Sequence, residues 1–256
     1  MTKAVFLRPL IVFVGLLIIW QFIVFLTDVP AYILPGPTNV AAAFEGRFDT
    51  LAVNAGVTLI EIVAGFAIGA TIGMASALFM AYFRPARRWM MPVLVVSQTV
   101  PVFALAPILT LWLGYGIESK IAMAVLIIYF PVTAAFFDGL GRTNPGWVDI
   151  AHVMNASRWS QLRHIRIPAA MPSLGSGLRV AAAVAPIGAV VGEWVGSSAG
   201  LGYLMLHANA RVQIDLMFAA LFTLAAMGCI FYFAIDNIAR RLAPWQIEIT
   251  IERDER

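Results

Sequence analysis

Long runs of apolar residues are the feature that most limits how this chain can fold. An α-helix needs roughly 20 such residues to cross the hydrocarbon core of a bilayer. Hydrophobic residues make up 61% of the chain and charged residues only 12%, whereas a soluble domain carries about 25% charged residues. We therefore predict an all-α integral membrane protein, a single transmembrane domain over residues 1–256 with about six membrane-spanning helices. The predicted spans are residues 9–27, 62–83, 89–117, 121–137, 169–195 and 216–235.

The basic residues predict how the spans are oriented. With the N-terminus in the cytoplasm, only Arg47, Lys120 and Arg211 of the 17 basic residues would lie outside. Cytoplasmic loops carry an excess of Lys and Arg, so we expect both termini in the cytoplasm. The net charge of +3 has the same origin, and no nucleic-acid partner is expected. No small-residue cleavage site follows the first run, which we expect to remain as a helix.

Small residues recur on one face of the second run. Gly65, Gly69 and Gly73 are spaced four residues apart, so they share one side of a helix. Small side chains let two helix backbones approach closely in lipid, where no hydrophobic effect drives helices together. The pattern predicts a tight helix–helix contact.

The third run contains polar residues next to a proline. Gln98 and Thr99 come shortly before Pro101. Proline bends a helix and frees a backbone carbonyl, which the membrane tolerates where protein or a wet cavity satisfies that group. The pattern predicts a bent helix whose polar side chains either line a translocation path or bond to a neighbouring helix at a structural kink.

The fifth run contains an acidic residue near its outer end, Glu193. Ionisable side chains within a span usually face the bundle interior or a cavity. Glu193 would then contribute to the translocation path or its gate, or else lie at the headgroup level in contact with water. The same alternatives hold for Glu61, at the start of the second run.

The longest cytoplasmic loop, residues 141–172, begins with an amphipathic pattern. One apolar face is expected because apolar residues recur at i, i+3, i+4 and i+7. They are Trp147, Ile150, Ala151 and Met154.

A second short helix is expected after a break at Asn155. Ser157 can cap it, and it should end before Pro168, because the residue before a proline disfavours helical geometry. Two such helices form either a docking element for a partner or a pair lying on the bilayer surface. The second helix would carry Trp159, Leu162 and Ile165.

This loop resembles the signature loop of ATP-binding cassette (ABC) importer permeases. Three residues separate Ala151 from Asn155 and nine separate Asn155 from Ile165, as in that family. Asp149 stands where the family has Glu, and Asn155 where Gly is usual; Asn tolerates a left-handed turn. The resemblance implies a coupling helix that docks in a groove of the ATPase subunit. Its residues would be Trp147, Asp149, Ile150, Ala151, Met154, Asn155, Ala156, Ser157, Trp159, Leu162, Ile165 and Pro168.

The resemblance extends over most of the chain. Residues 104–116 and 192–204 resemble the branch that serves nitrate, taurine and other sulfonates, and pyrimidine precursors of thiamine, and residues 205–211 most resemble the pyrimidine permeases. It implies the type I importer arrangement in a bacterial inner membrane. Two copies of this chain would bind two ATPase subunits, which hold ATP and Mg, and an extracytoplasmic solute-binding protein would deliver a small polar solute.

Motifs of other protein classes are not found in the sequence. It has no Gly-x-x-x-x-Gly-Lys-Ser/Thr phosphate loop and no Cys/His cluster with metal-ligand spacing. We therefore expect no catalysis, no cofactor and no metal on this chain. A self-contained channel or secondary transporter and an intramembrane enzyme remain as alternatives.

Overall fold

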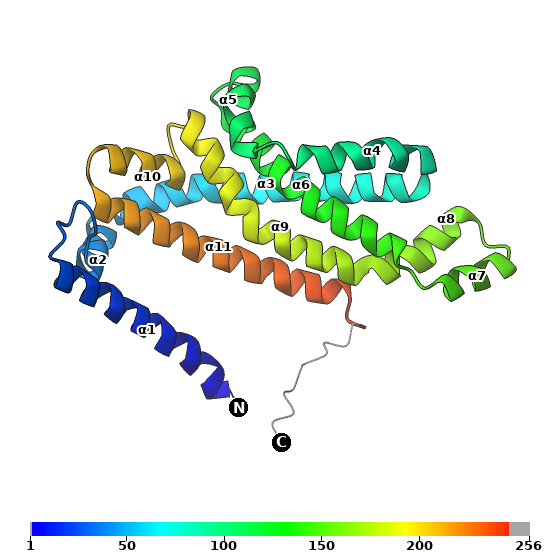
Figure 1. Ribbon diagram of the computed structural model, residues 1–256, viewed down its shortest axis with the longest axis horizontal. Helices are drawn as coiled ribbons and strands as arrows, with labels where there is room; N and C mark the ends of the chain where they lie inside the picture. The colour runs from blue at the N-terminus through cyan, green and yellow to red at the C-terminus, as the bar shows by residue number, and fades with distance from the viewer. Residues whose placement is uncertain (1, 246–256) are drawn as a thin grey trace.

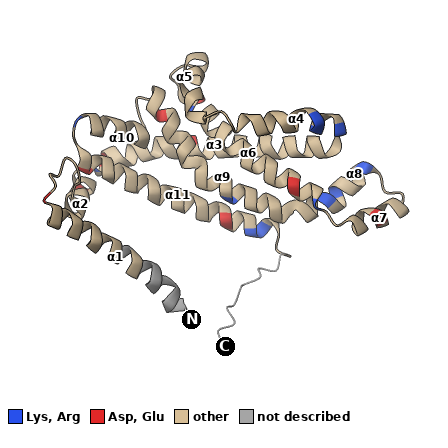
Figure 2. Cartoon of the chain, viewed as in Figure 1, with Lys and Arg blue, Asp and Glu red and all other residues tan. Residues whose placement is uncertain are grey.

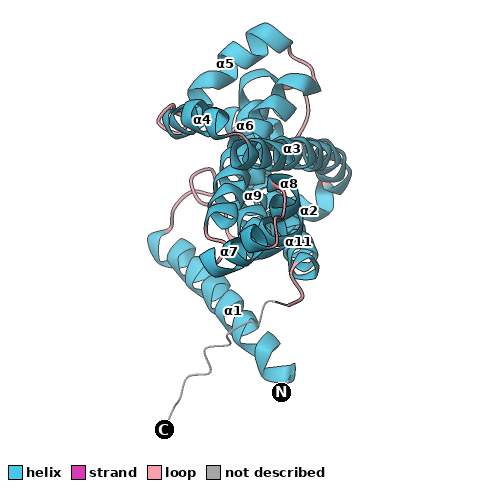
Figure 3. Cartoon of the chain, turned by 90° about the vertical axis from the view of Figure 1, so that its right-hand side faces the viewer, coloured by secondary structure: helices cyan, strands magenta, loops and turns pink. Residues whose placement is uncertain are grey.

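The computed structural model describes residues 2–245, and for residues 2–10 and 13 the backbone only. Every regular element in this part of the chain is helical (Figures 1 and 3). The elements are α1 (Thr2–Thr27), α2 (Pro37–Gly46), α3 (Phe48–Tyr82), α4 (Arg84–Ser97), α5 (Val102–Leu113), α6 (Ile117–Gly141), α7 (Pro145–Val153), α8 (Arg158–Gln161), the π-helical turn η1 (Leu162–Arg166), α9 (Ile167–Gly196), α10 (Leu201–Ala210) and α11 (Ile214–Leu242).

Every predicted span except the third overlaps one long helix. By length and composition, α3, α6, α11 and the continuous helix over Arg158–Gly196 can each cross a membrane, and the bent pair α4 and α5 can form a fifth span. The first predicted run falls in α1, whose apolar stretch within the described residues is Val14–Thr27. The prediction of an all-helical membrane protein is confirmed.

Helix α6 lies between α3 and α9, and glycines on both neighbours make this possible. A Cβ at Gly65 would overlap Ala124, and one at Gly69 would lie 3.0 Å from Ile128. From the other side, a Cβ at Gly188 would lie 2.7 Å from the Ala124 Cα atom. The predicted glycine face of α3 therefore touches α6; Gly73 of that face approaches Thr133.

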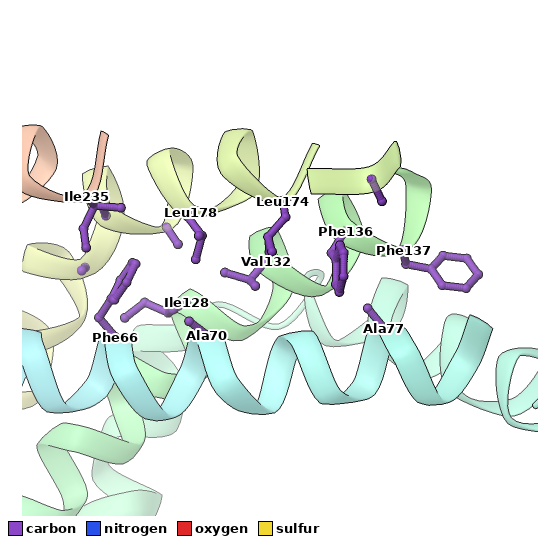
Figure 4. Packing of buried hydrophobic residues seen from close by; sticks show 14 of the residues in the cluster. Phe66, Ala70, Ala77, Ile128, Val132, Phe136, Phe137, Leu174, Leu178 and Ile235 are labelled. Carbon is purple, nitrogen blue, oxygen red and sulfur yellow. The ribbon is translucent and has the colours of Figure 1, made fainter. Parts of the chain in front are cut away.

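Interlocking apolar side chains fill the centre of this bundle. Ile128 and Val132 of α6 are fully buried between α3 and α9, in the same cluster as the buried Ala70 of α3 (Figure 4). Phe66 meets Phe231 of α11 edge to face, with ring centroids 5.2 Å apart. Close packing of this kind holds helices together in lipid through dispersion contacts.

Helix α1 diverges from the bundle (Figure 1). Trp20 stacks on Phe218 of α11 with ring centroids 5.8 Å apart. Side chains such as Phe25, which is 80% exposed, are left for lipid or for another protein to cover.

The third predicted span differs from the prediction, because two helices replace one. Helix α4 starts at Arg84 and runs along α3, and α5 turns away from it by 103° (Figure 1). The break falls at residues 98–101, where Pro101 has no amide hydrogen to donate. The hydroxyl of Thr99 donates to the Val96 carbonyl at 2.7 Å and so satisfies a carbonyl at the end of α4.

Candidate functional site

The loop between α6 and α9 starts with a helix that leaves an apolar face uncovered. The Asn144 side chain caps α7 by accepting from the Gly146 amide at 2.9 Å, and Pro145 occupies the first turn, where no amide donor is needed. Ile150 and Met154 are 61% and 76% exposed. Of the predicted face, Ala151 is the exception, because it is buried against the protein. Trp147 and Asp149 are also exposed.

The turn after α7 has the left-handed geometry that the resemblance requires. Asn155 has φ = 54°. Its amide donates to the His152 carbonyl, and the Ala156 amide donates to Ala151, both at 2.9 Å. This hydrogen-bond pattern is a Schellman motif, in which glycine is the usual left-handed residue. It explains physically how Asn replaces Gly at this position.

The second helix of the loop begins as predicted but does not end as predicted. The Ser157 hydroxyl accepts from the Ser160 amide at 3.2 Å and so caps α8. The prediction that the helix ends before Pro168 is wrong. The π-helical turn η1 leads directly into α9, with the Ile167 amide donating to the Leu162 carbonyl. A proline is tolerated in the first turn of α9 because the wider turn before it uses the i→i+5 bonding pattern.

The loop is therefore rigidly joined to a membrane-spanning helix. Residues Arg158–Gly196 form 39 residues of uninterrupted helix. Leu162 is buried in the bundle core, and the Gln161 side-chain amide (Nε2) donates to the Ala156 carbonyl at 2.9 Å. Trp159 packs edge to face on Tyr82, at the end of α3, with centroids 6.1 Å apart. Ile165 and Pro168 are half-buried and line a cavity of about 570 Å³ beside Trp147.

A second cavity, of about 430 Å³, lies beside α4 and α5. Gln98 lines it, as do Trp89 and Tyr129. None of its lining side chains carries a charge; the others are Met90, Val93, Leu94, Ser97, Val102, Leu105 and Leu126. Thr99 and Pro101, which were predicted for the path beside Gln98, do not line this cavity.

Glu193 is almost completely buried, with 1% of its surface exposed. Its Oε1 atom accepts from the Thr58 hydroxyl at 2.6 Å. Its Oε2 atom accepts from the backbone amides of Gly202 and Tyr203, which are unpaired donors of the first turn of α10. In this structure Glu193 thus caps α10, and its contribution to a path stays a prediction.

Two glycines at the start of α10 and two polar residues of α3 complete this polar cluster. None of the four was identified from the sequence as part of a site. A Cβ at Gly200 would overlap the Glu193 carboxylate, and one at Gly202 would lie 2.8 Å from it. Asn54 accepts from the Gly200 amide at 2.7 Å, and Thr58 from the Leu201 amide at 2.8 Å. The only sequence signal was a Gly-Leu-Gly segment shortly after a glutamate within a span.

Glu61 and Lys120 are both buried near the same cluster. The Glu61 carboxyl group lies beside that of Glu193. Lys120 was placed outside on the charge count, yet its ammonium group is buried and donates to the carbonyls of Tyr115 and Gly116 at 2.9 and 2.8 Å. These contacts stabilise the turn between α5 and α6.

Comparisons with known proteins agree with this architecture. The family model described as "Binding-protein-dependent transport system inner membrane component" matches residues 65–245. A probable ABC transporter permease protein of Haemophilus influenzae is 50% identical, over 94% of this chain and 98% of its own length. The formylaminopyrimidine transport permease protein ThiX of Halalkalibacterium halodurans is 35% identical, over 94% of this chain and 96% of its own.

The fold also resembles a solved membrane protein. An inward-facing structure of the MetNI methionine ABC transporter has a TM-score of 0.57, at 18% identity, covering 76% of this chain and 95% of that chain.

Proposed function

Since the chain belongs to the family of binding-protein-dependent transport system inner membrane components, the multi-pass membrane permeases of ABC importers, we propose that two copies of it enclose a path for a small polar solute. The ATPase of such importers is a separate subunit. In our proposal the ATPase subunits bind the loop at residues 141–172, and a solute-binding protein delivers the solute at the opposite end.

The observation that carries the proposal is the continuity of the loop with α9. A helix of 39 residues is about 60 Å long at 1.5 Å per residue, so a push on α8 reaches the far end of the span. Ile150, Met154 and Trp159 leave an apolar face exposed for an ATPase groove. Closing the ATPase pair would tilt α9 and convert the inward-open state to the outward-open state. A difference of a few kcal/mol in the free energy with which the closed ATPase pair binds the two states is enough for this shift.

The distribution of charge supports an orientation with the loop in the cytoplasm. The basic residues gather at the end of the bundle that carries the loop (Figure 2). Arg87 of α4 lies over the Phe137 ring of α6 at 5.3 Å, and Arg142 lines the cavity beside α7. By the positive-inside rule, the N- and C-termini would then lie in the cytoplasm.

The uncharged cavity beside α4 and α5 favours a pyrimidine over an anion as the solute. Trp89 and Tyr129 offer aromatic faces on which a flat heterocycle can stack, and the Gln98 amide can both donate and accept hydrogen bonds. A sulfonate or nitrate anion would lose its hydration on entering this cavity, where no cationic side chain could pair with the anion. The relative named as a formylaminopyrimidine permease supports the same choice.

Affinity purification from native membranes tests the docking loop. Ile150→Arg places a charge in the exposed face of α7, and Ile33→Arg makes the same change at the opposite end, where Ile33 is 60% exposed. We expect an ATPase subunit to co-purify with the unchanged protein and with Ile33→Arg, and to be lost with Ile150→Arg. An ATPase that stays with Ile150→Arg would refute docking through this face. Transport by the chain alone, without an ATPase subunit, would favour a channel or secondary transporter.

A further inference from the structure

Three arginines from separate parts of the chain surround one small cavity. Arg84 lies at the junction of α3 and α4, Arg158 at the start of α8 and Arg166 at the end of η1, and together they line a cavity of about 170 Å³. His152 also faces it. None of the residues that line the cavity is acidic; the others are Ala81, Tyr82, Gln161 and Leu162.

The three guanidinium groups have no carboxylate partner within residues 2–245. The ion pairs in this part of the chain join only Arg179 and Arg240 to Asp236. Like charges around one cavity repel each other. An anion between them would remove the repulsion and accept several charge-assisted hydrogen bonds, which a planar guanidinium makes best with phosphate or carboxylate oxygens.

The cavity lies where a membrane surface is expected. The apolar span of α3 ends at Tyr82, one of the residues lining the cavity. The side chains of Tyr82 and of the next residue, Phe83, are 38% and 47% exposed. Aromatic side chains concentrate at the level of the lipid head groups, so the ligand most available to these arginines is a lipid phosphate.

We propose that the cavity between Arg84, Arg158 and Arg166 binds a phosphate group, and that its source is the head group of an anionic phospholipid. The bound phosphate holds the loop, through α8 and η1, against the end of α3. Membrane charge thereby stabilises the position of the loop from which α9 is moved. This site differs from the exposed face of α7 and from the cavity beside α4 and α5.

Lipid binding to the purified full-length chain in nanodiscs tests the site. The double variant Arg84→Gln with Arg158→Gln removes two charges from the cavity. The control, Arg88→Gln with Arg163→Gln, removes two exposed charges that do not line it. Native mass spectrometry would compare phosphatidylglycerol with phosphatidylcholine. We expect the cavity variant to bind phosphatidylglycerol roughly tenfold or more weakly, and the control to change less than twofold.

Further measurements distinguish a lipid phosphate in this cavity from general surface charge, free phosphate and a protein partner. Arg84→Lys keeps the charge and should keep most of the binding, and thermal unfolding of each variant checks that it is folded. Equal losses in both double variants would indicate general surface charge and overturn the site. Inorganic phosphate that binds without any preference for phosphatidylglycerol would overturn the lipid source. If lipid binding is unchanged and the ATPase subunit no longer co-purifies, the arginines bind a protein partner and the lipid site is refuted.

Discussion

At the scale of single residues, Glu193 shows how a membrane protein keeps a carboxylate inside a span. Two backbone amides of α10 and the Thr58 hydroxyl donate to it, so α10 is attached to α9 and α3 at once. An uncapped helix end within a membrane leaves donors that lipid cannot satisfy. Glu193 therefore stabilises the packing of α10 against α9 and α3.

Replacing Glu193 with alanine should destabilise the protein. The change leaves buried donors of α10 unpaired, at a cost of about 1–3 kcal/mol for each. We expect the thermal midpoint in detergent to fall by several degrees, and less for Glu193→Gln, which keeps one acceptor. Glu45→Ala removes an exposed acid and serves as the control. Equal midpoints for Glu193→Ala and Glu45→Ala would contradict the capping role.

Asn155 offers a test of the turn in the loop. A β-branched residue at φ = 54° costs about 1–2 kcal/mol, whereas glycine adopts this conformation without strain. Asn155→Val should therefore speed hydrogen exchange at the Ala156 amide, which bonds to Ala151, and Asn155→Gly should not. Exchange that is equally slow in both variants would show that the left-handed turn carries no strain.

At the scale of elements, the glycine faces decide how closely α3, α6 and α9 pack. A Cβ atom at Gly69 of α3 or at Gly188 of α9 would press against α6. A Cβ atom at Gly56, which is also on α3, would have no other atom within 4 Å. Close contact in lipid depends on such positions. The three helices therefore act as one unit, from which α4, α5 and α1 extend.

Leucine at Gly69 should separate α3 from α6. Overpacking of a tight contact costs about 1–3 kcal/mol or more, so we expect a low yield of folded protein on size-exclusion chromatography. The same leucine at Gly56 should leave the yield unchanged. A normal yield from Gly69→Leu would mean that this contact is looser than the structure shows.

The long helices are largely predictable from the sequence, whereas the residues at which helices end or join are less predictable. The long helices follow from apolar runs, and the Ser157 cap from residue type. The prediction that the second helix of the loop ends before Pro168 was wrong. A π-helical turn depends on how Leu162 packs in the core, and the conformational preferences of the local sequence do not reveal it. Thr58 and Glu193 lie 135 positions apart, and only the packing of α3 against α9 brings them together.

At the scale of the whole molecule, the two ends of the bundle differ in chemistry and are joined by α9. The loop end carries exposed apolar residues and arginines, and the opposite end carries the buried polar cluster around Glu193. We propose that the continuous helix from α8 to α9 transmits ATP-driven movement between the two ends.

Spin-label distances in the assembled complex test this coupling. Ser198, just beyond the far end of α9, is exposed and can be changed to cysteine in a Cys229→Ser background. The complex would then carry one label on each of its two copies of the chain. With ATP and Mg trapped on the ATPase, we predict that the distance between these two labels changes. In a variant with Ile167→Gly and Pro168→Gly, which makes the joint flexible, the ATPase should stay bound and active but the distance should not change. An equal change in both proteins, or none in the unchanged one, would contradict coupling through α9.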